Sequence, residues 1–109
     1  MPRPELLSNE HVQEQLALHP LWRLSADGIQ PKHIVRELHA KDWMAALAIV
    51  NAIAIVADTM DHHPDLFLYG WNKVRVTVST HDQGGLTPLD FALADKIDAL
   101  PFSSEAKAG

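Results

Sequence analysis

Residues 42–80 read DWMAALAIVNAIAIVADTMDHHPDLFLYGWNKVRVTVST, and their pattern decides the fold. The first part predicts one long helix from Trp43 to about Asp61, because Asp42 can accept hydrogen bonds from the free N–H groups of its first turn. Apolar residues recur three and four positions apart, which predicts a stripe that faces the core. That stripe comprises Trp43, Ala46, Leu47, Val50, Ile53, Ala54 and Ala57.

The opposite side of this helix is apolar as well. Its members are Met44, Ala48, Ile49 and Val56. A helix that is apolar nearly all round is buried on more than one side. In so short a chain, the second side predicts an interface between subunits.

Two strands are predicted after the helix, over Phe67–Trp71 and Lys73–Thr80, with Asn72 between them. In the second strand, valines alternate with polar residues, which is the period of a strand with one buried face. These valines are Val74, Val76 and Val78.

The residues before residue 42 predict a shorter helix and a hairpin. Ser8 can cap a helix over residues 9–18. Residues 21–25 and 34–39 then alternate as two strands joined at Asp27-Gly28, a dipeptide typical of tight hairpin turns.

A last helix is predicted after Gly84-Gly85, with Thr87 as its cap, Pro88 at its first position and Asp90 in its first turn. The order of elements is therefore helix, two strands, helix, two strands, helix. This order predicts an α+β fold, with a four-stranded antiparallel sheet and three helices on one face.

The composition indicates one globular domain, predicted over residues 8–101, with loose termini at 1–7 and 102–109. The 109 residues contain no cysteine, which excludes disulfides and thiolate metal sites and suits a cytoplasmic location. The net charge of −5, with scattered Lys and Arg, argues against a nucleic-acid partner. The longest apolar stretch, Met44–Ala57, is shorter than the roughly 20 residues that span a bilayer, so no membrane segment is expected.

Polar residues with catalytic potential gather in the segment DTMDHHP, at the end of the long helix. Asp58 and His62 are four residues apart, so they share a helix face on which the carboxylate could fix the tautomer of the ring. Pro64 disfavours helical geometry for His63, so the two rings need not point the same way. His81 follows the last strand, where a side chain can be both held and exposed.

Two other interpretations of these histidines stay open. A pair of histidines at a helix C-terminus can complement the helix dipole without any catalytic part. Three imidazoles and a water can also hold zinc, and His62, His63 and His81 would supply the imidazoles. The remaining histidines show no grouping and are predicted to lie on the surface. They are His11, His19, His33 and His39.

The spacing of these residues resembles the signature of pterin-4a-carbinolamine dehydratases. The matching residues are Asp58-x3-His62-His63-Pro64, then Trp71 after six residues, His81 after nine and Asp90 after eight. The flanking stretches 71–74, 77–82 and 84–87 agree as well, and the resemblance covers about residues 8 to 100.

Three positions depart from the family pattern. Asp58 stands where Glu is commoner, Leu66 replaces a frequent aromatic residue, and Trp71 takes a place that Tyr often occupies. These departures bear on substrate affinity more than on the reaction.

The resemblance implies a pterin site between two segments. It assigns Asp61, His62, His63 and Pro64 to one side, and Ser79, Thr80, His81 and Asp82 to the other. It further implies that His62, His63, His81 and Asp58 are catalytic, with neither a metal nor another cofactor. Homodimers or homotetramers are expected, with the long helix helping assembly.

The implied reaction is loss of the 4a-hydroxyl of a tetrahydropterin to give a quinonoid dihydropterin, which recycles the cofactor of aromatic amino-acid hydroxylases. One protonated group must donate to the departing oxygen, and one base must take the ring-nitrogen proton. Histidine, with an ordinary pKa of about 6.5, can do either. We interpret His62 as the acid or base oriented by Asp58, His81 as its counterpart and His63 mainly as a binding contact.

The rival hypothesis is a non-catalytic assembly or dimerisation module that reuses the fold, but such a module has no need for all three histidines.

Overall fold

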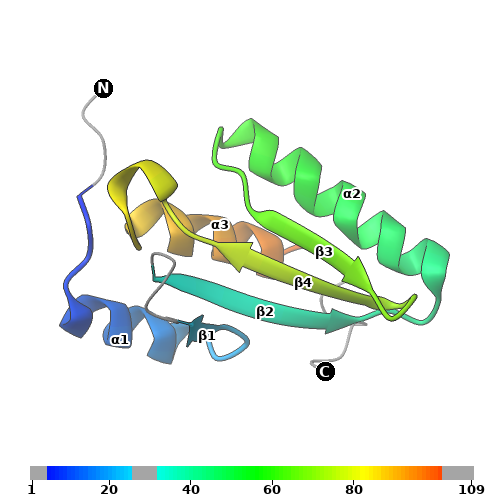
Figure 1. The fold of residues 1–109 in the computed structure, drawn as a ribbon, viewed down its shortest axis with the longest axis horizontal. Coiled ribbons are helices and arrows are strands. Elements are labelled where there is room, and N and C mark those ends of the chain that lie inside the picture. The colour runs from blue at the N-terminus through cyan, green and yellow to red at the C-terminus, as the bar shows by residue number, and fades with distance from the viewer. Residues whose placement is uncertain (1–4, 26–31, 102–109) are drawn as a thin grey trace.

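The computed structural model describes residues 5–25 and 32–101. Its elements confirm the predicted α+β order (Figure 1). In chain order they are α1 (Asn9–Leu18), β1 (Arg23–Ser25), β2 (His33–His39), α2 (Trp43–Thr59), β3 (Asp65–Tyr69), β4 (Lys73–Val78), the 3₁₀ helix η1 (His81–Gln83) and α3 (Pro88–Asp98). The predicted Asp27-Gly28 turn and the predicted tail at 102–109 lie outside the described residues. No helix of the described ranges is long and apolar enough to cross a membrane.

The four strands form one antiparallel sheet in the order β1-β2-β4-β3. The central pair, β2 and β4, comes from different halves of the chain, so this pairing joins the two halves. Val12 of α1, Ile53 of α2 and Leu93 of α3 belong to one core cluster with the inward side chains of the sheet. Those side chains include Ile34, Leu38, Val74, Val76 and Val78. The three helices therefore cover one face, as predicted.

Local sequence signals account for where the helices begin. The Ser8 hydroxyl accepts a hydrogen bond from the N–H of His11 at 3.1 Å, and the Asp42 carboxylate accepts one from Ala45 at 2.8 Å. The third predicted cap, Thr87, accepts from Leu89 at 3.2 Å. All three caps are confirmed.

The ends of α2 and β3 differ from the prediction by about two residues. α2 stops at Thr59 rather than Asp61, and β3 covers Asp65–Tyr69 rather than Phe67–Trp71. The strand cannot extend to Trp71, because Gly70 and Trp71 have φ values of 54° and 60° and form the turn into β4.

The buried stripe of α2 was misplaced in part. The buried residues are Ala46, Ile49, Ile53 and Ala57. Ile49 was predicted to face outward, whereas Trp43 and Ala54, predicted to face the core, are exposed. A helix that is apolar all round offers little contrast from which to locate its inward face. The prediction of an exposed second apolar side holds for Met44 and Ala48.

Candidate active site

Three parts of the chain meet at the Asp90 carboxylate, which is fully buried in the first turn of α3. Its Oδ1 lies 2.7 Å from Nε2 of His62, just beyond α2. Its Oδ2 accepts hydrogen bonds from the Thr80 hydroxyl and from the backbone N–H of Thr87, both at 2.8 Å. Thr80 follows β4, and its hydroxyl lies 2.9 Å from that of Thr87. One carboxylate thus links the ends of α2 and β4 to the start of α3.

This contact fixes the tautomer of the buried His62 ring. An ionised carboxylate can only accept, so Nε2 of His62 carries a proton and donates it to Asp90. Within residues 5–25 and 32–101, Nδ1 of His62 has no hydrogen-bond partner. In the neutral ring Nδ1 holds the lone pair, and in the imidazolium it holds the second proton. Nδ1 is therefore the atom through which His62 can exchange a proton with a ligand.

The predicted contact between Asp58 and His62 is wrong. Oδ1 of Asp58 lies instead 3.1 Å from Nε2 of His63, and both of these side chains are exposed. The cause is the end of α2, since His62 lies beyond the last helical residue and no longer shares a helix face with Asp58.

A Schellman motif ends α2 and sends the two histidines in different directions. The N–H of His62 donates to the carbonyl of Ala57 at 3.2 Å, and the N–H of Asp61 donates to that of Asp58 at 3.1 Å. Asp61 takes the left-handed position, with φ of 50°, where glycine is the usual residue. His62 then points inward to Asp90, and His63 stays on the surface.

The backbone at Asp61 is a site of stored strain, so Asp61→Gly is expected to stabilise the fold by about 0.5–1 kcal/mol. Glycine adopts the left-handed region freely, although its greater freedom in the unfolded chain offsets part of the gain. Urea denaturation with an unchanged slope would measure the difference. Asp58→Gly, inside the helix, is the matched control and should lower stability by about 0.3 kcal/mol, the difference between the helix propensities of Asp and Gly. A urea midpoint lower than that of the wild type would show that the backbone at Asp61 stores no strain.

The second predicted segment lies directly after β4. His81 begins η1, is exposed, and its Nε2 lies 3.4 Å from the Ser79 hydroxyl. Ser79 and Thr80 are buried, and Asp82 is exposed. Thr80 pairs with Gly85 across the η1 turn, which fixes the turn to the end of the sheet.

The structure brings only part of the predicted site into contact. Asp90 links His62 to Thr80, and Asp58 pairs with His63. In the described part of the chain, no hydrogen bond or ion pair joins His81 to His62 or to His63.

A cavity of about 390 Å³ lies beside the Asp58–His63 pair. Its other walls are apolar and come from α2, from the residue before β3 and from the start of β3. They are formed by Ala54, Ile55, Ala57, Pro64 and Leu66. A volume of this size is typical of small-ligand sites, and the polar pair that lines it could hydrogen-bond to the edge of a ring whose face contacts the apolar walls.

A metal centre was the alternative use of the three histidines. Across residues 5–25 and 32–101, no three His, Asp or Glu side chains converge to hold a metal ion.

Sequence reasoning missed Asp90 as the partner of His62. It placed Asp90 in the matched signature and in the first turn of the last helix, but gave it no contact. The spacing Thr87-x-x-Asp90 predicts a capping box, which uses the carboxylate locally. A capping carboxylate still has one oxygen able to accept another bond, and this spare oxygen was the available signal.

Comparisons with known proteins place the chain in a family. The family model for pterin 4 alpha carbinolamine dehydratase matches residues 5–100. A protein of Chloroflexus aurantiacus with the provisional name pterin-4-alpha-carbinolamine dehydratase is 42% identical over 100 residues, which cover 92% of this chain and 98% of the relative. A relative from Metallosphaera sedula with the same provisional name is 38% identical over 100 residues, covering 92% of this chain and 95% of the relative.

Two solved structures are similar as well. A transcriptional coactivator/pterin dehydratase from Brucella melitensis superposes with a TM-score of 0.77 at 33% identity, covering 87% of this chain and 97% of that one. A pterin dehydratase-like RuBisCO assembly factor of the alpha-carboxysome has a TM-score of 0.57 at 20% identity, covering 72% and 86%, and shares the fold alone. The family model matches nearly the whole chain, and the relatives from Chloroflexus aurantiacus and Metallosphaera sedula are 42% and 38% identical to it. The chain therefore belongs to the pterin 4 alpha carbinolamine dehydratase family.

Proposed function

We propose that this protein dehydrates 4a-hydroxytetrahydropterins to quinonoid dihydropterins and so recycles the cofactor of aromatic amino-acid hydroxylases. The observation that carries the proposal is the buried His62, whose Nε2 is fixed on Asp90 and whose Nδ1 is left for proton exchange. A histidine held in one tautomer by a buried carboxylate is a common arrangement for acid–base chemistry.

The elimination needs two proton transfers and no change of oxidation state. The lone pair of N5 forms the C4a=N5 double bond while the C4a–O bond breaks. An acid protonates the departing hydroxyl, which leaves as water, and a base takes the proton from N5. We assign these two parts to Nδ1 of His62 and to the ring of His81. One of these rings acts as the acid and the other as the base.

The remaining predicted residues are proposed to bind the pterin. The cavity beside His63 supports a binding part for that ring and for Asp58, since both line it. Asp61, Ser79 and Asp82 flank the two histidines in the chain and would supply polar contacts to the pterin edge. Pro64 and Leu66 would supply apolar contacts to its face.

A spectroscopic assay tests the proposal. Freshly made 4a-hydroxytetrahydropterin is mixed with purified protein, and formation of the quinonoid product is followed against the spontaneous reaction. Catalysed formation is the expected result. A rate equal to the spontaneous one would favour a non-catalytic assembly module, the activity named for the alpha-carboxysome relative of the same fold.

We also propose that the protein self-associates through the exposed side of α2. Trp43, Met44 and Ile55 on this helix expose 51%, 66% and 67% of their surface. Lone subunits seldom carry an apolar patch of this kind, which supports a homodimer or homotetramer.

A cytoplasmic location, expected from the absence of cysteine, stays a prediction.

Sedimentation at micromolar concentration is expected to show a species larger than the 12.1 kDa chain. The double variant Met44→Glu/Ile55→Glu should shift it toward the monomer, because it places charge on the apolar side of α2. Leu18→Glu is the matched control on α1, where Leu18 is 72% exposed. A wild-type protein that sediments as a monomer would contradict the interface.

A further inference from the structure

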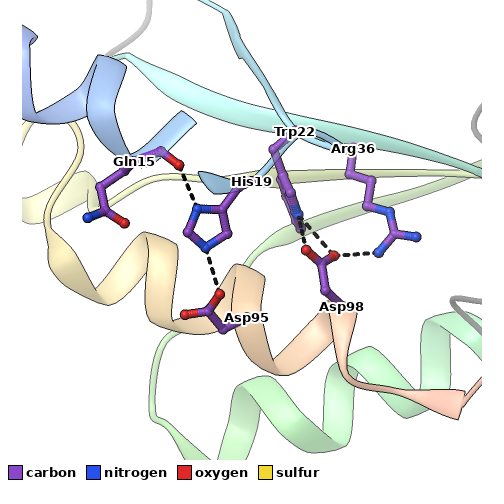
Figure 2. A network of polar contacts seen from close by, with 6 residues as sticks. All are labelled: Gln15, His19, Trp22, Arg36, Asp95 and Asp98. Atoms are coloured by element: carbon purple, nitrogen blue, oxygen red, sulfur yellow. Dashed lines mark hydrogen bonds and ion pairs between the residues drawn. The ribbon is translucent and has the colours of Figure 1, made fainter. Parts of the chain in front are cut away.

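His19 is buried between α1 and α3, although the sequence predicted a surface position. It directly follows α1 and is 6% exposed. Its Nδ1 lies 2.6 Å from the main-chain oxygen of Gln15, and its Nε2 lies 2.6 Å from Oδ1 of Asp95 (Figure 2). The ring also contacts Phe91, with the ring centres 5.3 Å apart. His19 thus ties the end of α1 to α3.

Both polar partners of the His19 ring are acceptors. A carbonyl oxygen and an ionised carboxylate oxygen carry no proton, so each ring nitrogen must donate. A neutral imidazole has a single N–H, and therefore only the imidazolium satisfies both contacts. Loss of one proton would leave a lone pair facing an oxygen at 2.6 Å.

The charges around the ring favour its protonated form. The Gln15 carbonyl is among the last four of α1, where the helix dipole is negative. Asp95 and Asp98 of α3 are the acidic groups that face the ring, and Asp98 is itself bound by Nη1 of Arg36 from β2 at 2.5 Å. Burial alone would lower the pKa of His19, but the Gln15 carbonyl and Asp95 outweigh it and raise that pKa above its ordinary value.

The segment before α1 lies on the loop that contains His81. The N–H of Leu7 donates to the carbonyl of Leu86 at 2.8 Å, although residues 1–7 were predicted to be loose. Gly85, beside Leu86, pairs with Thr80, which directly precedes His81. The position of α1 is therefore coupled to the loop of residues 81–86.

We propose that His19 is a protonation-dependent positioning residue. Its imidazolium holds α1 on α3, and the segment before α1 then seats the loop that carries His81. The catalytic consequence rests on the proposed function, because it assumes that His81 takes part in the dehydration. The contacts of His19 themselves do not depend on that assumption.

The direction of the pH effect follows from the raised pKa. A group whose pKa is higher in the folded state contributes its full stabilisation below its unfolded value, about 6.5 for histidine. The contribution is lost as the pH rises through the folded pKa of His19. The N-terminal segment should therefore loosen as the pH rises through the raised midpoint of His19, and not as the pH falls.

Histidine NMR titration combined with amide exchange tests the proposal. His19 should titrate above the ordinary histidine value of about 6.5. The protection factor of the Leu7 amide should fall about fivefold across the His19 midpoint, the ratio expected for one lost hydrogen bond. Asp95→Asn should move the His19 midpoint and the Leu7 transition to lower pH together, since Asn removes the charge but keeps an acceptor.

Two controls and the dehydration assay make every outcome interpretable. His11→Ala should leave both midpoints in place, and the Asn72 amide at the far hairpin should show no transition. The proposal is overturned if the protection factor of the Leu7 amide does not change across the His19 titration. It is also overturned if Asp95→Asn leaves the His19 midpoint unchanged. In the dehydration assay, kcat/KM should fall at the same midpoint and shift with Asp95→Asn. Normal NMR transitions without any turnover would reject the proposed function and leave the His19 coupling supported.

Discussion

Replacing His62 or His81 by Ala is expected to slow dehydration about 100- to 10,000-fold, the usual span for a lost general acid or base. For His62, the reason is the fixed Nε2–Asp90 contact, which leaves Nδ1 as the proton-exchanging atom. For His81, the reason is its exposed place at the end of β4, next to a segment anchored on the same Asp90. Steady-state kcat and kcat/KM of each variant, measured with freshly made carbinolamine, check the expectation.

The double variant separates a joint mechanism from two independent contacts. If His62 and His81 act in one elimination, the double variant loses much less than the product of the two single losses, because groups that act as a unit are not additive. His11→Ala is the matched control, since this exposed ring on α1 takes no part in the site. Wild-type turnover in both single variants would reject the assignment.

The fold was predictable wherever its determinants are local. Ser8, Asp42 and Thr87 accept hydrogen bonds from N–H groups two or three residues ahead, so the starts of the helices are visible in the sequence. The valines of β4 alternate with polar residues, because one face of the sheet is buried in the core and the other is partly exposed. The inward face of α2 was misplaced, because it is set by contacts with other elements and its apolar residues occur on all sides.

The candidate site was predictable as residue types but not as contacts. Asp58 was paired with His62 on the assumption that the helix continues for one more turn. The left-handed backbone of Asp61 ends the helix earlier, so that His62 contacts Asp90, 28 residues further along the chain. His19 shows the same limit, since its partner Asp95 is 76 residues away and nothing near His19 in the sequence indicates it. Spacing reveals neighbours on one element, whereas these partners meet only through packing.

Asp90→Asn is expected to keep the fold and to slow dehydration by about 100- to 10,000-fold, because it reverses the tautomer of His62. The Asn oxygen can still accept from the Thr80 hydroxyl and the Thr87 N–H. Its NH₂ group then faces Nε2 of His62 and can only donate, so the neutral ring must carry its proton on Nδ1. As a base, His62 then lacks a lone pair at Nδ1, and as an acid it lacks the carboxylate that stabilises its imidazolium.

Two measurements distinguish this tautomer effect from damage to the fold. Nitrogen NMR of His62 should show the proton on Nε2 in the wild type and on Nδ1 in Asp90→Asn. In a His62→Ala background, Asp90→Asn should cost little further activity, because it acts through that ring. Asp90→Ala is the contrasting variant: it leaves buried donors without an acceptor and should destabilise the fold by about 3–5 kcal/mol. An equal loss of rate from Asp90→Asn with and without His62 would show that Asp90 serves the capping of α3 and not the chemistry.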